Sequence, residues 1–395
     1  MKRMLAMAMA ASMALTMMTG CSSTPSSSSS TPTSGDSSSQ SSQSAIEGAV
    51  KIGLLAPLTG EVAVYGTAVR NGAELAFEEI NAQGGLQFDV EVLDEKGDVN
   101  EAINAYNMLL SKEIAALLGD VTSKPSIAVA ELAAEDNVPM ITATGTAADI
   151  TQKGDNIFRT CFMDPTQGKA MATFAKETLK AEKVAIMYNT SDDYSVGVAT
   201  AFKETAEASG MTVEAYEGYG NDDKDFKTQL TTIGSKDVDV LFVPDYYNKV
   251  ALIIAQAREV GYDKPILGAD GFDGVVGAVS ADNTAILNNV YFSNHYSTSD
   301  ESEKVQSFLK NYQAKYGEMP NSFAALAYDT AYILKDAFER AGSVEPDAVV
   351  AALAATDYEG VTGHITFDDN GDSVKGISII EIKDGQYTLN SKVVA

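Results

Sequence analysis

The sequence predicts an α/β fold of two lobes, each built on a parallel central sheet. Short runs rich in Val, Ile and Leu alternate with amphipathic helical patterns from residue 50 onward. Such repeated strand–helix–strand order favours parallel sheets that helices cover on both faces. The chain has 395 residues, 45% of them hydrophobic, and this length favours two lobes over one.

Eight apolar runs predict strands. The first helix, between two of them, carries apolar residues at helical spacing and ends at Gly84 and Gly85, a typical C-terminal signal. Its apolar residues are Val69, Ala73, Ala76 and Ile80. The predicted strands are 50–55, 90–93, 115–119, 138–142, 183–188, 238–243, 265–268 and 290–293.

Two later segments predict a hinge and a terminal pair of strands. The pattern breaks at residues 161–168, where Pro165 and Gly168 interrupt it, and we expect a hinge there. Near the C-terminus, 365–367, the polar run 368–372 and 377–382 predict strand, turn and strand.

The N-terminus predicts export and lipid anchoring. A basic start and a short apolar run indicate a signal peptide over residues 1–20. The small residues Thr19 and Gly20 before Cys21 match a bacterial lipobox, although Met18 stands where Leu is usual. An ordinary signal peptide cut nearby is the alternative. Acyl chains on Cys21 would anchor the protein, because each buried CH₂ contributes ~0.8 kcal/mol.

Residues 21–45 are expected to form a lipidated tether. After Cys21 the segment is almost entirely Ser with Thr, Pro, Gly and Gln, a composition with nothing to bury. A flexible coil of this length reaches on the order of 25–30 Å. Cys161 is the second of two cysteines, so an acylated Cys21 leaves no pair for an intrachain disulfide.

Composition argues against nucleic-acid binding and against catalysis. A formal charge of −27 excludes nucleic acid as a partner. The two histidines, His295 and His364, are far apart, and Cys161 lies among apolar residues as a small buried hydrophobe does. Sequence motifs of serine hydrolases, zinc proteases and nucleotide-binding loops are missing. We expect a non-enzyme without cofactor or metal, with 368–372 forming a turn instead of a calcium loop.

Loops after the first strands predict a site for a carboxylate. Ligands of parallel sheets bind at the carboxyl ends of strands. The loop 57–66 exposes Tyr65, and the loops 119–126 and 142–147 are rich in hydroxyls at helix starts. Such hydroxyls and unpaired amides suit an anion. The alternative is that these hydroxyls only cap helices; they belong to Ser123, Ser126, Thr144 and Thr146.

Loops in the second half supply an acid and an aromatic ring. The segment 187–197 contains Tyr194, and 268–274 contains Asp270. A carboxylate facing a cleft could pair with an ammonium group through charge-assisted hydrogen bonds. The alternative is an Asp that simply ends a strand in a turn.

Four segments together resemble the periplasmic branched-chain amino-acid-binding proteins, the type I solute-binding subunits of ABC importers. They are the opening strand with its loop to Gly66, the helix end 80–85, the segment 138–146 and the late segment 320–329. The resemblance runs from about Val50 to the C-terminus. It implies two Rossmann-like lobes with parallel sheets and a multi-segment hinge. The lobes would be 46–163 with 295–375, and 164–294 with 376–395.

The resemblance also implies roles for the first-lobe residues. Ser123 and Thr146 would bind the α-carboxylate of an amino acid. The carbonyl of Thr144 and the hydroxyl of Thr146 would help to hold its ammonium. Gly145 stands where the family often has Ala, so its contact would come from the backbone.

Across the cleft, the resemblance implies an aromatic cover and an acid. Tyr194 would cover the ligand backbone, and Asp270 would bind the ammonium where relatives often have Glu. Tyr65 and Tyr246 would line the side-chain pocket, with Tyr247 the alternative to Tyr246. A cysteine pair of the best-known relatives is missing, which leaves the side-chain preference open.

We therefore expect an extracytoplasmic, membrane-anchored lipoprotein that captures an amino acid, branched-chain Leu, Ile or Val, and delivers it to an ABC importer. Its partners would be the ligand, the importer permease and the membrane, and the protein would be a monomer. The alternatives are a ligand-sensing lipoprotein of the same fold, or a receptor for another small amino acid, amide or carboxylate.

Overall fold

The computed structural model describes residues 46–393, which belong to one compact unit spanning Gln43–Ala395. The predicted signal peptide, Cys21 and the tether up to residue 45 lie outside the described residues. Within 46–393, none of the helices combines the length and the apolar character needed to cross a membrane.

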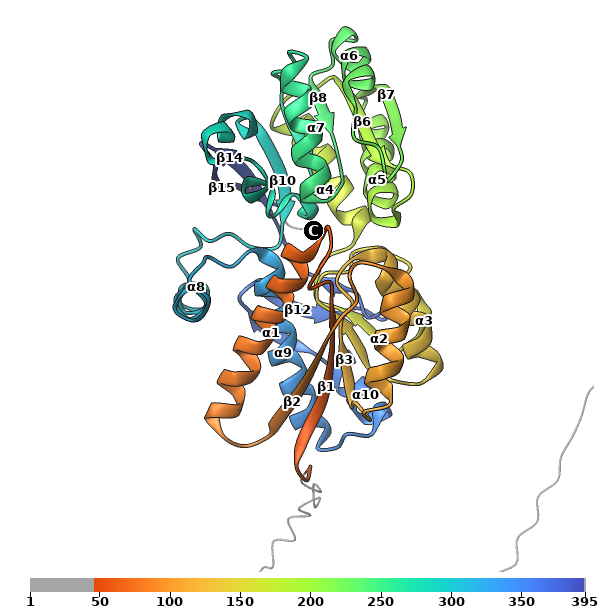
Figure 1. The fold of residues 1–395 in the computed structure, drawn as a ribbon, viewed down its shortest axis with the longest axis vertical. Helices are drawn as coiled ribbons and strands as arrows, with labels where there is room; N and C mark the ends of the chain where they lie inside the picture. The colour runs from red at the N-terminus through yellow and green to blue at the C-terminus, as the bar shows by residue number, and fades with distance from the viewer. Residues whose placement is uncertain (1–45, 394–395) are drawn as a thin grey trace, which may run out of the picture. The chain divides into compact units, whose positions relative to one another are not determined.

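A five-stranded parallel sheet occupies the first part of the described chain (Figure 1). Its strand order is β2-β1-β3-β4-β5, so β2 lies on one side of β1 and β3 lies on the other. The loops after β1 and β3 therefore diverge, and this switch point is where open parallel sheets bind ligands. The strands are β1 (Ala49–Ala56), β2 (Gln87–Asp94), β3 (Ala116–Leu118), β4 (Met140–Thr142) and β5 (Ile157–Arg159).

Helices cover both faces of this sheet, because successive strand residues point to opposite sides. On β1, Leu54 packs into the core with α1 and α9, whereas Leu55 packs into the core with α2 and α3. Figure 1 shows α1 beside α9 on one side of β1. The helices are α1 (Ala63–Gln83), α2 (Val99–Leu110), α3 (Ser123–Glu135), α8 (Glu303–Tyr316), α9 (Ser322–Ala341) and α10 (Pro346–Ala354).

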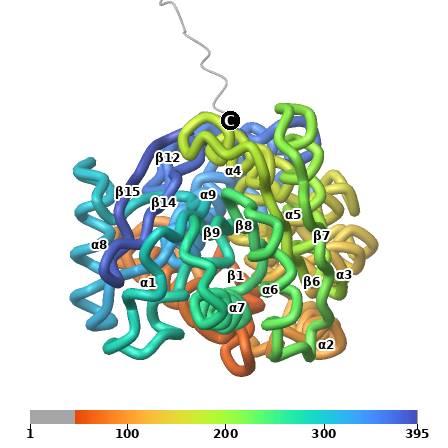
Figure 2. Tube along the Cα trace, turned by 90° about the horizontal axis from the view of Figure 1, so that it is seen from above, coloured from red at the N-terminus to blue at the C-terminus, as the bar shows by residue number. Residues whose placement is uncertain are grey.

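A seven-stranded sheet follows, in the order β15-β14-β10-β9-β8-β6-β7. Figure 2 labels β15, β14, β9, β8, β6 and β7 in this order from side to side. Its first five strands along the chain pair in parallel, and β14 and β15 add antiparallel strands at one edge. The switch point of this sheet lies between β6 and β8. The strands are β6 (Lys183–Asn189), β7 (Thr212–Tyr219), β8 (Val240–Phe242), β9 (Ile266–Gly268), β10 (Val290–Asn294), β14 (Ile377–Lys383) and β15 (Gln386–Val393).

Four helices pack on this second sheet, and two of them, α4 and α5, pack closely against each other. Gly168 of α4 makes that approach possible, because a Cβ there would lie 2.6 Å from the Val198 carbonyl oxygen. The helices are α4 (Asp164–Glu177), α5 (Asp193–Ala208), α6 (Lys227–Ser235) and α7 (Tyr247–Glu259). Short 3₁₀ turns are η1 (Thr151–Lys153), η2 (Asp270–Phe272), η3 (Val275–Ala278) and η4 (Ala281–Leu287).

The fold class and all eight predicted strands are confirmed, whereas β5, β7, β11 (Asp357–Gly360), β13 (Ser373–Val374) and β15 were not predicted. The glycine signal at the end of α1 is confirmed as well, with Gly84 as its C-cap. Residues 164–168 of the predicted hinge form the start of α4, and the hinge itself stays a prediction. The lobe boundaries stay a prediction.

The predicted C-terminal strand pair needs correction. The turn is confirmed: the Asp368 amide donates to the Asp372 carbonyl oxygen at 2.9 Å. The partner strand is wrong, because β12 (Gly363–Phe367) pairs with β13 (Ser373–Val374) in a small sheet with β11 (Asp357–Gly360). The run predicted to close the hairpin is β14, which instead joins the large sheet.

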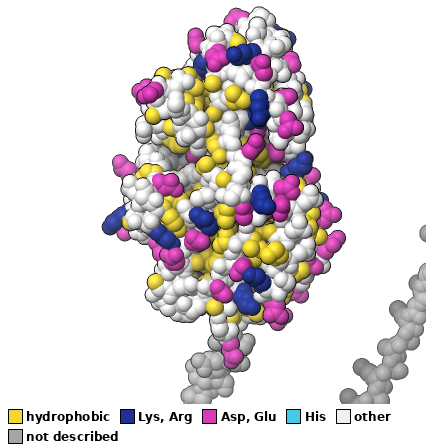
Figure 3. Space-filling view, viewed as in Figure 1, with side chains coloured by type: hydrophobic (Ala, Val, Ile, Leu, Met, Phe, Trp, Pro, Cys, Tyr) yellow, Lys and Arg dark blue, Asp and Glu magenta, His cyan; other side chains and the backbone are white. Residues whose placement is uncertain are grey.

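Charged side chains of both signs are interspersed over the face seen in Figure 3. Exposed ion pairs such as Lys203 with Glu207, at 2.8 Å, contribute little stability each. On this face the acidic residues are spread out, as on an ordinary solvated surface.

Candidate ligand-binding site

The residues predicted for the first half of the site follow strands of the five-stranded sheet. Tyr65 lies near the start of α1, after β1, and Ser123 begins α3, after β3. Thr144, Gly145 and Thr146 follow β4. All five are buried, so the expectation that the loop 57–66 exposes Tyr65 is wrong. The loops at the carboxyl edge of this sheet thus hold the hydroxyls and the helix start that the sequence predicted.

Hydrogen bonds fix the two hydroxyl-rich loops to each other. The Ser123 hydroxyl accepts from the Ala147 amide at 3.2 Å. The Thr144 hydroxyl donates to the Val121 carbonyl oxygen at 2.8 Å. Because this hydroxyl is used within the loops, a ligand would contact Thr144 through its backbone. A Cβ at Gly145 would lie 2.8 Å from Ile150 Cδ1, so Ala there would require its neighbours to shift.

The second group of predicted residues follows strands of the seven-stranded sheet. Tyr194 lies in the first turn of α5, after β6, and Tyr246 directly precedes α7, after β8. Their rings stack with centroids 5.1 Å apart. Asp270 begins η2, after β9, and the Gly271 amide next to it donates to the Tyr194 hydroxyl at 2.9 Å. The switch point of this sheet therefore presents two aromatic rings beside an acid.

Tyr65 connects the two groups. Its hydroxyl donates to the Gly271 carbonyl oxygen at 2.5 Å and accepts from the Tyr247 amide at 2.9 Å. Its ring lies 5.9 Å from that of Tyr246 and stacks on Phe323, with centroids 4.2 Å apart. A residue of the first sheet thus bonds the loops of the second, and the eight predicted residues lie in two facing groups.

Several buried polar atoms around these groups lack hydrogen-bond partners within the described chain. They are both carboxylate oxygens of Asp164, Oδ1 of Asp270, Nε2 of Gln167, Nδ1 of His295 and the Tyr246 hydroxyl. A buried polar atom without a partner costs about 1–3 kcal/mol, so native proteins rarely keep several together. A polar ligand would supply these atoms with partners.

Three of these residues were not predicted as part of the site. His295 directly follows β10, and the rule that ligands bind at carboxyl ends of strands would have found it. Asp164 and Gln167 lie in the first turn of α4, within the segment that the sequence predicted as a hinge. Phe323 lies in the segment 320–329 that carried the resemblance, but no role was assigned to it.

Burial shapes the electrostatics of the site. It raises the pKa of Asp164 well above the usual range and raises the pKa of Asp245 to about 7. It lowers the pKa of His295 to about 4. Burial and then the charge of Asp270 raise the pKa of Asp273, and the same charge further raises the pKa of Asp164. A cationic group bound here would offset this repulsion.

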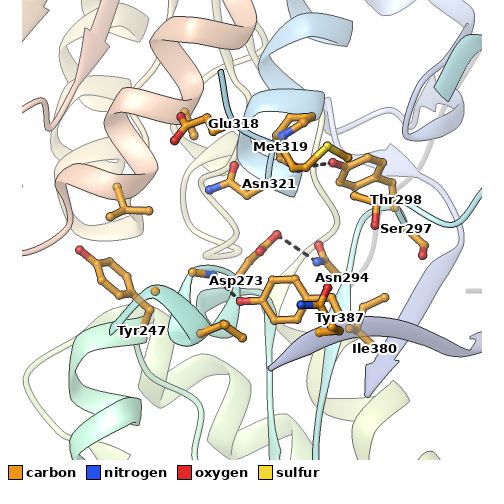
Figure 4. Close-up of a pocket in the computed structure, with 18 of the residues that line it drawn as sticks. Tyr247, Asp273, Asn294, Ser297, Thr298, Glu318, Met319, Asn321, Ile380 and Tyr387 are labelled. Carbon is orange, nitrogen blue, oxygen red and sulfur yellow. Dashed lines mark hydrogen bonds between the residues drawn. The ribbon is translucent and has the colours of Figure 1, made fainter. Parts of the chain in front are cut away.

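A cavity of about 740 Å³ lies next to this site (Figure 4). Tyr247, Asp273 and Asn294 line one wall, and Glu318 and Met319 line the other. None of the eight predicted residues lines it. The Asp273 carboxylate at its wall already accepts from Asn294 and from the Ser322 amide. The cavity is therefore separate from the predicted contacts.

Two buried carboxyl groups lie beneath the Ser123 loop, Glu95 after β2 and Asp120 after β3. Oε1 of Glu95 and Oδ2 of Asp120 have no hydrogen-bond partner among the residues that the structure describes. Burial, and then the charge of Asp120, raise the pKa of Glu95 well above its usual value of 4.5. The folded protein therefore keeps a proton that the unfolded chain releases above about pH 4.5, and stability falls as pH rises from there.

Glu95→Gln should remove this loss of stability. The Gln amide is neutral at every pH and can donate to Asp120. We expect the variant to exceed the wild type in free energy of unfolding by ~1 kcal/mol or more at pH 8, with the difference vanishing near pH 4. Urea unfolding at both pH values measures it. An equal difference at both would contradict the proton that folded Glu95 is expected to keep.

Within residues 46–393, clusters of three or more His, Cys, Asp or Glu that could hold a metal ion are absent. Cys161 is buried, as predicted, and its thiol donates to the Gly145 carbonyl oxygen at 3.2 Å. His364 is exposed and lies 2.7 Å from Asp357.

Comparison with known proteins assigns the family. A family model described as "Periplasmic binding protein" matches residues 49–386. The chain is 34% identical to the Leu/Ile/Val-binding protein BraC3 of Rhizobium johnstonii over 336 residues, which cover 82% of this chain and 88% of the relative.

Solved structures of similar proteins support the same family. The branched-chain amino acid transporter substrate-binding protein LivJ of Streptococcus pneumoniae, solved in complex with isoleucine, is 35% identical with a TM-score of 0.82, covering 88% of this chain and 99% of that one. The leucine-binding protein LivK of Thermotoga maritima is 32% identical with a TM-score of 0.80, covering 87% and 99%. The chain therefore belongs to the periplasmic binding protein family, whose members bind solutes for ABC transporters.

Proposed function

We propose that this protein captures a branched-chain amino acid, Leu, Ile or Val, between its two facing groups of loops and delivers it to an ABC importer. The observation that carries the proposal is Oδ1 of Asp270, a buried carboxylate oxygen with no partner in the described chain. An ammonium group would satisfy it. The names of the relatives support the same ligand class, since LivJ was solved with isoleucine and BraC3 is named for Leu, Ile and Val.

The ligand carboxylate would bind at the first group of loops. Ser123 begins α3, where backbone amides without intrahelical partners and the helix dipole favour a negative charge. Thr146 contributes its hydroxyl from the neighbouring loop. Its own carbonyl oxygen accepts from the Asp164 amide at 2.9 Å, which fixes the loop against the start of α4.

The ligand ammonium would lie between the Thr144 carbonyl, the Thr146 hydroxyl and Asp270. A ligand without the ammonium would leave Asp270 unpaired in a closed site, and sites built for a polar group reject such analogues strongly. We therefore expect strong selection for α-amino acids.

The ligand side chain would contact the rings of Tyr65, Tyr246 and Phe323. These rings form an apolar wall, and one methylene in an apolar pocket changes binding by roughly 1–3 kcal/mol. Discrimination among Val, Leu and Ile should therefore be modest.

Ligand titration by calorimetry tests the proposal. The protein is unfolded and refolded to remove bound ligand, then titrated with Leu, Ile, Val, Ala and 4-methylpentanoate, which is leucine without its ammonium. We expect binding of the first three and none of 4-methylpentanoate. If no amino acid binds, the proposed ligand class is wrong.

Tyr65→Phe tests the bond between the two groups of loops. The variant keeps the ring stacked on Phe323 but loses the hydroxyl that contacts Gly271 and Tyr247. We expect about tenfold weaker binding of leucine, because the closed form loses these hydrogen bonds. Tyr291→Phe, which removes a hydroxyl that contacts Glu381 on β14, is the matched control. Unchanged affinity in Tyr65→Phe would contradict the role of the hydroxyl in closure.

Membrane anchoring and delivery complete the proposal. Cys21 would carry the acyl chains, and the protein would act as a monomer beside the permease. Labelling cells with a radioactive fatty acid tests the first part: the wild type should take up label and Cys21→Ser should not. Leucine uptake in cells that carry Cys21→Ser or a gene deletion tests the second.

A further inference from the structure

His295 directly contacts the acid of the candidate site. Its Nε2 lies 3.2 Å from Oδ2 of Asp270, and both side chains are buried, with exposed fractions of 0% and 4%. The imidazole ring also stacks on Phe162, with centroids 3.7 Å apart and planes at 19°. The ring is thus held on one face by an aromatic residue while its edge meets a carboxylate.

The rest of Asp270 is also held in place. Its backbone amide donates to Oε1 of Gln167 at 2.9 Å, and the same oxygen accepts from the Ser293 hydroxyl at 2.9 Å. Its second carboxylate oxygen, Oδ1, is buried and has no partner within residues 46–393. Oδ2 of Asp270 is therefore held by His295, whereas Oδ1 has no hydrogen-bond partner among the described residues.

The protonation of His295 follows from its surroundings. Burial lowers its pKa to about 4, so the ring is neutral at neutral pH and carries one N–H. That proton belongs on Nε2, because an unprotonated nitrogen facing Oδ2 would bring two acceptors together. His295 thus donates to Asp270, and Nδ1 is left as an acceptor.

We propose that His295 is the positioning residue of the ligand site: its Nε2–H holds Oδ2 of Asp270 so that Oδ1 faces the ligand ammonium. This inference rests on the proposed function. Hydrogen bonds to a charged group are worth more than neutral ones, so losing the donor leaves Asp270 less well oriented.

His295 lies on a segment that joins the two halves of the molecule, so closure of the two halves on a ligand would involve it. It lies between β10 of the seven-stranded sheet and α8, which packs near α1 of the other half. Its stacking partner Phe162 lies between β5 and α4, on another segment that joins the two halves. Movement of these segments would therefore move the group that orients Asp270.

Two substitutions separate the hydrogen bond from simple packing. The amide nitrogen of Gln lies about as far from the backbone as Nε2 of His, whereas that of Asn is one carbon closer and cannot reach Oδ2. We expect His295→Asn to raise the dissociation constant for leucine by about tenfold or more. We expect His295→Gln to stay within about threefold of the wild type.

The variants are compared by calorimetric titration with leucine, after urea unfolding has shown that each is folded. Equal affinity in His295→Asn and the wild type would overturn the inference. So would equal losses in His295→Asn and His295→Gln, because then the ring, not the donated proton, would matter. If the wild type itself binds no amino acid, the proposed function fails instead.

A second measurement tests the contact without any ligand. Nitrogen NMR of ¹⁵N-histidine-labelled protein distinguishes a protonated from an unprotonated ring nitrogen. We expect His295 to be protonated at Nε2 alone at neutral pH. A proton on Nδ1 of His295 would overturn the proposed hydrogen bond even if leucine binds.

Discussion

Asp270→Asn is expected to weaken leucine binding by about two orders of magnitude or more, the largest effect of any substitution in the candidate site. Removing one partner of a buried, hydrogen-bonded charge pair costs about 2–5 kcal/mol. In the wild type, Oδ1 of Asp270 is buried without a partner in the described chain and would meet the ligand ammonium. The amide that replaces it has the same shape but no charge, so the ammonium would be buried unpaired.

Calorimetric titration of the refolded protein with leucine measures the change. Asp222→Asn removes an acid that is exposed on the surface, and it should bind leucine like the wild type. Since Asn is isosteric with Asp, the unfolding transition of the variant should stay close to that of the wild type. If Asp270→Asn bound leucine with wild-type affinity, another acid would have to pair with the ammonium, and Asp164 would be the next to test.

The fold could be predicted from the sequence because its signals are local. The residues of β1 alternate between two cores, and α1 places its apolar residues at helical spacing. A short stretch of sequence is therefore enough to predict each element. β5, one of the strands that were missed, differs in this respect. It ends in the buried Arg159, whose partner Asp372 is 213 positions away in the chain. No local pattern reveals such a pair.

The candidate site could be predicted in part, because strand order brings loops together by a general rule. The carboxyl ends of parallel strands share one edge, which led to Ser123 and Asp270. The roles of these residues came from the resemblance and stay predictions. His295 directly follows a predicted strand, so the same rule would have found it, whereas Asp164 was missed because it lies in the segment that was predicted as a hinge.

Arg159→Met is expected to reduce the free energy of unfolding by about 3–5 kcal/mol, the usual effect of breaking a buried ion pair. Arg159 is fully buried, and its Nε lies 2.5 Å from Oδ1 of Asp372. Nη1 donates to the carbonyl oxygens of Gly145 and Ala147, at 3.0 and 2.8 Å. The substitution would remove the charged partner of Asp372, whose Oδ1 would keep only the Thr151 hydroxyl as donor, and it would remove one donor from each carbonyl group; losing such buried hydrogen bonds is costly.

Urea unfolding of Arg159→Met, beside the matched control Arg340→Met, tests this expectation. Arg340 is partly exposed and pairs with Asp336 one helical turn away, so its loss should cost less than about 0.5 kcal/mol. Because Arg159 also holds the loop that contains Thr146, leucine affinity should fall in Arg159→Met under conditions where the protein is still folded. A variant with an unchanged unfolding midpoint would contradict the stabilising role of Arg159. Loss of stability together with loss of affinity would show that one buried ion pair fixes both the fold and the loop of the site.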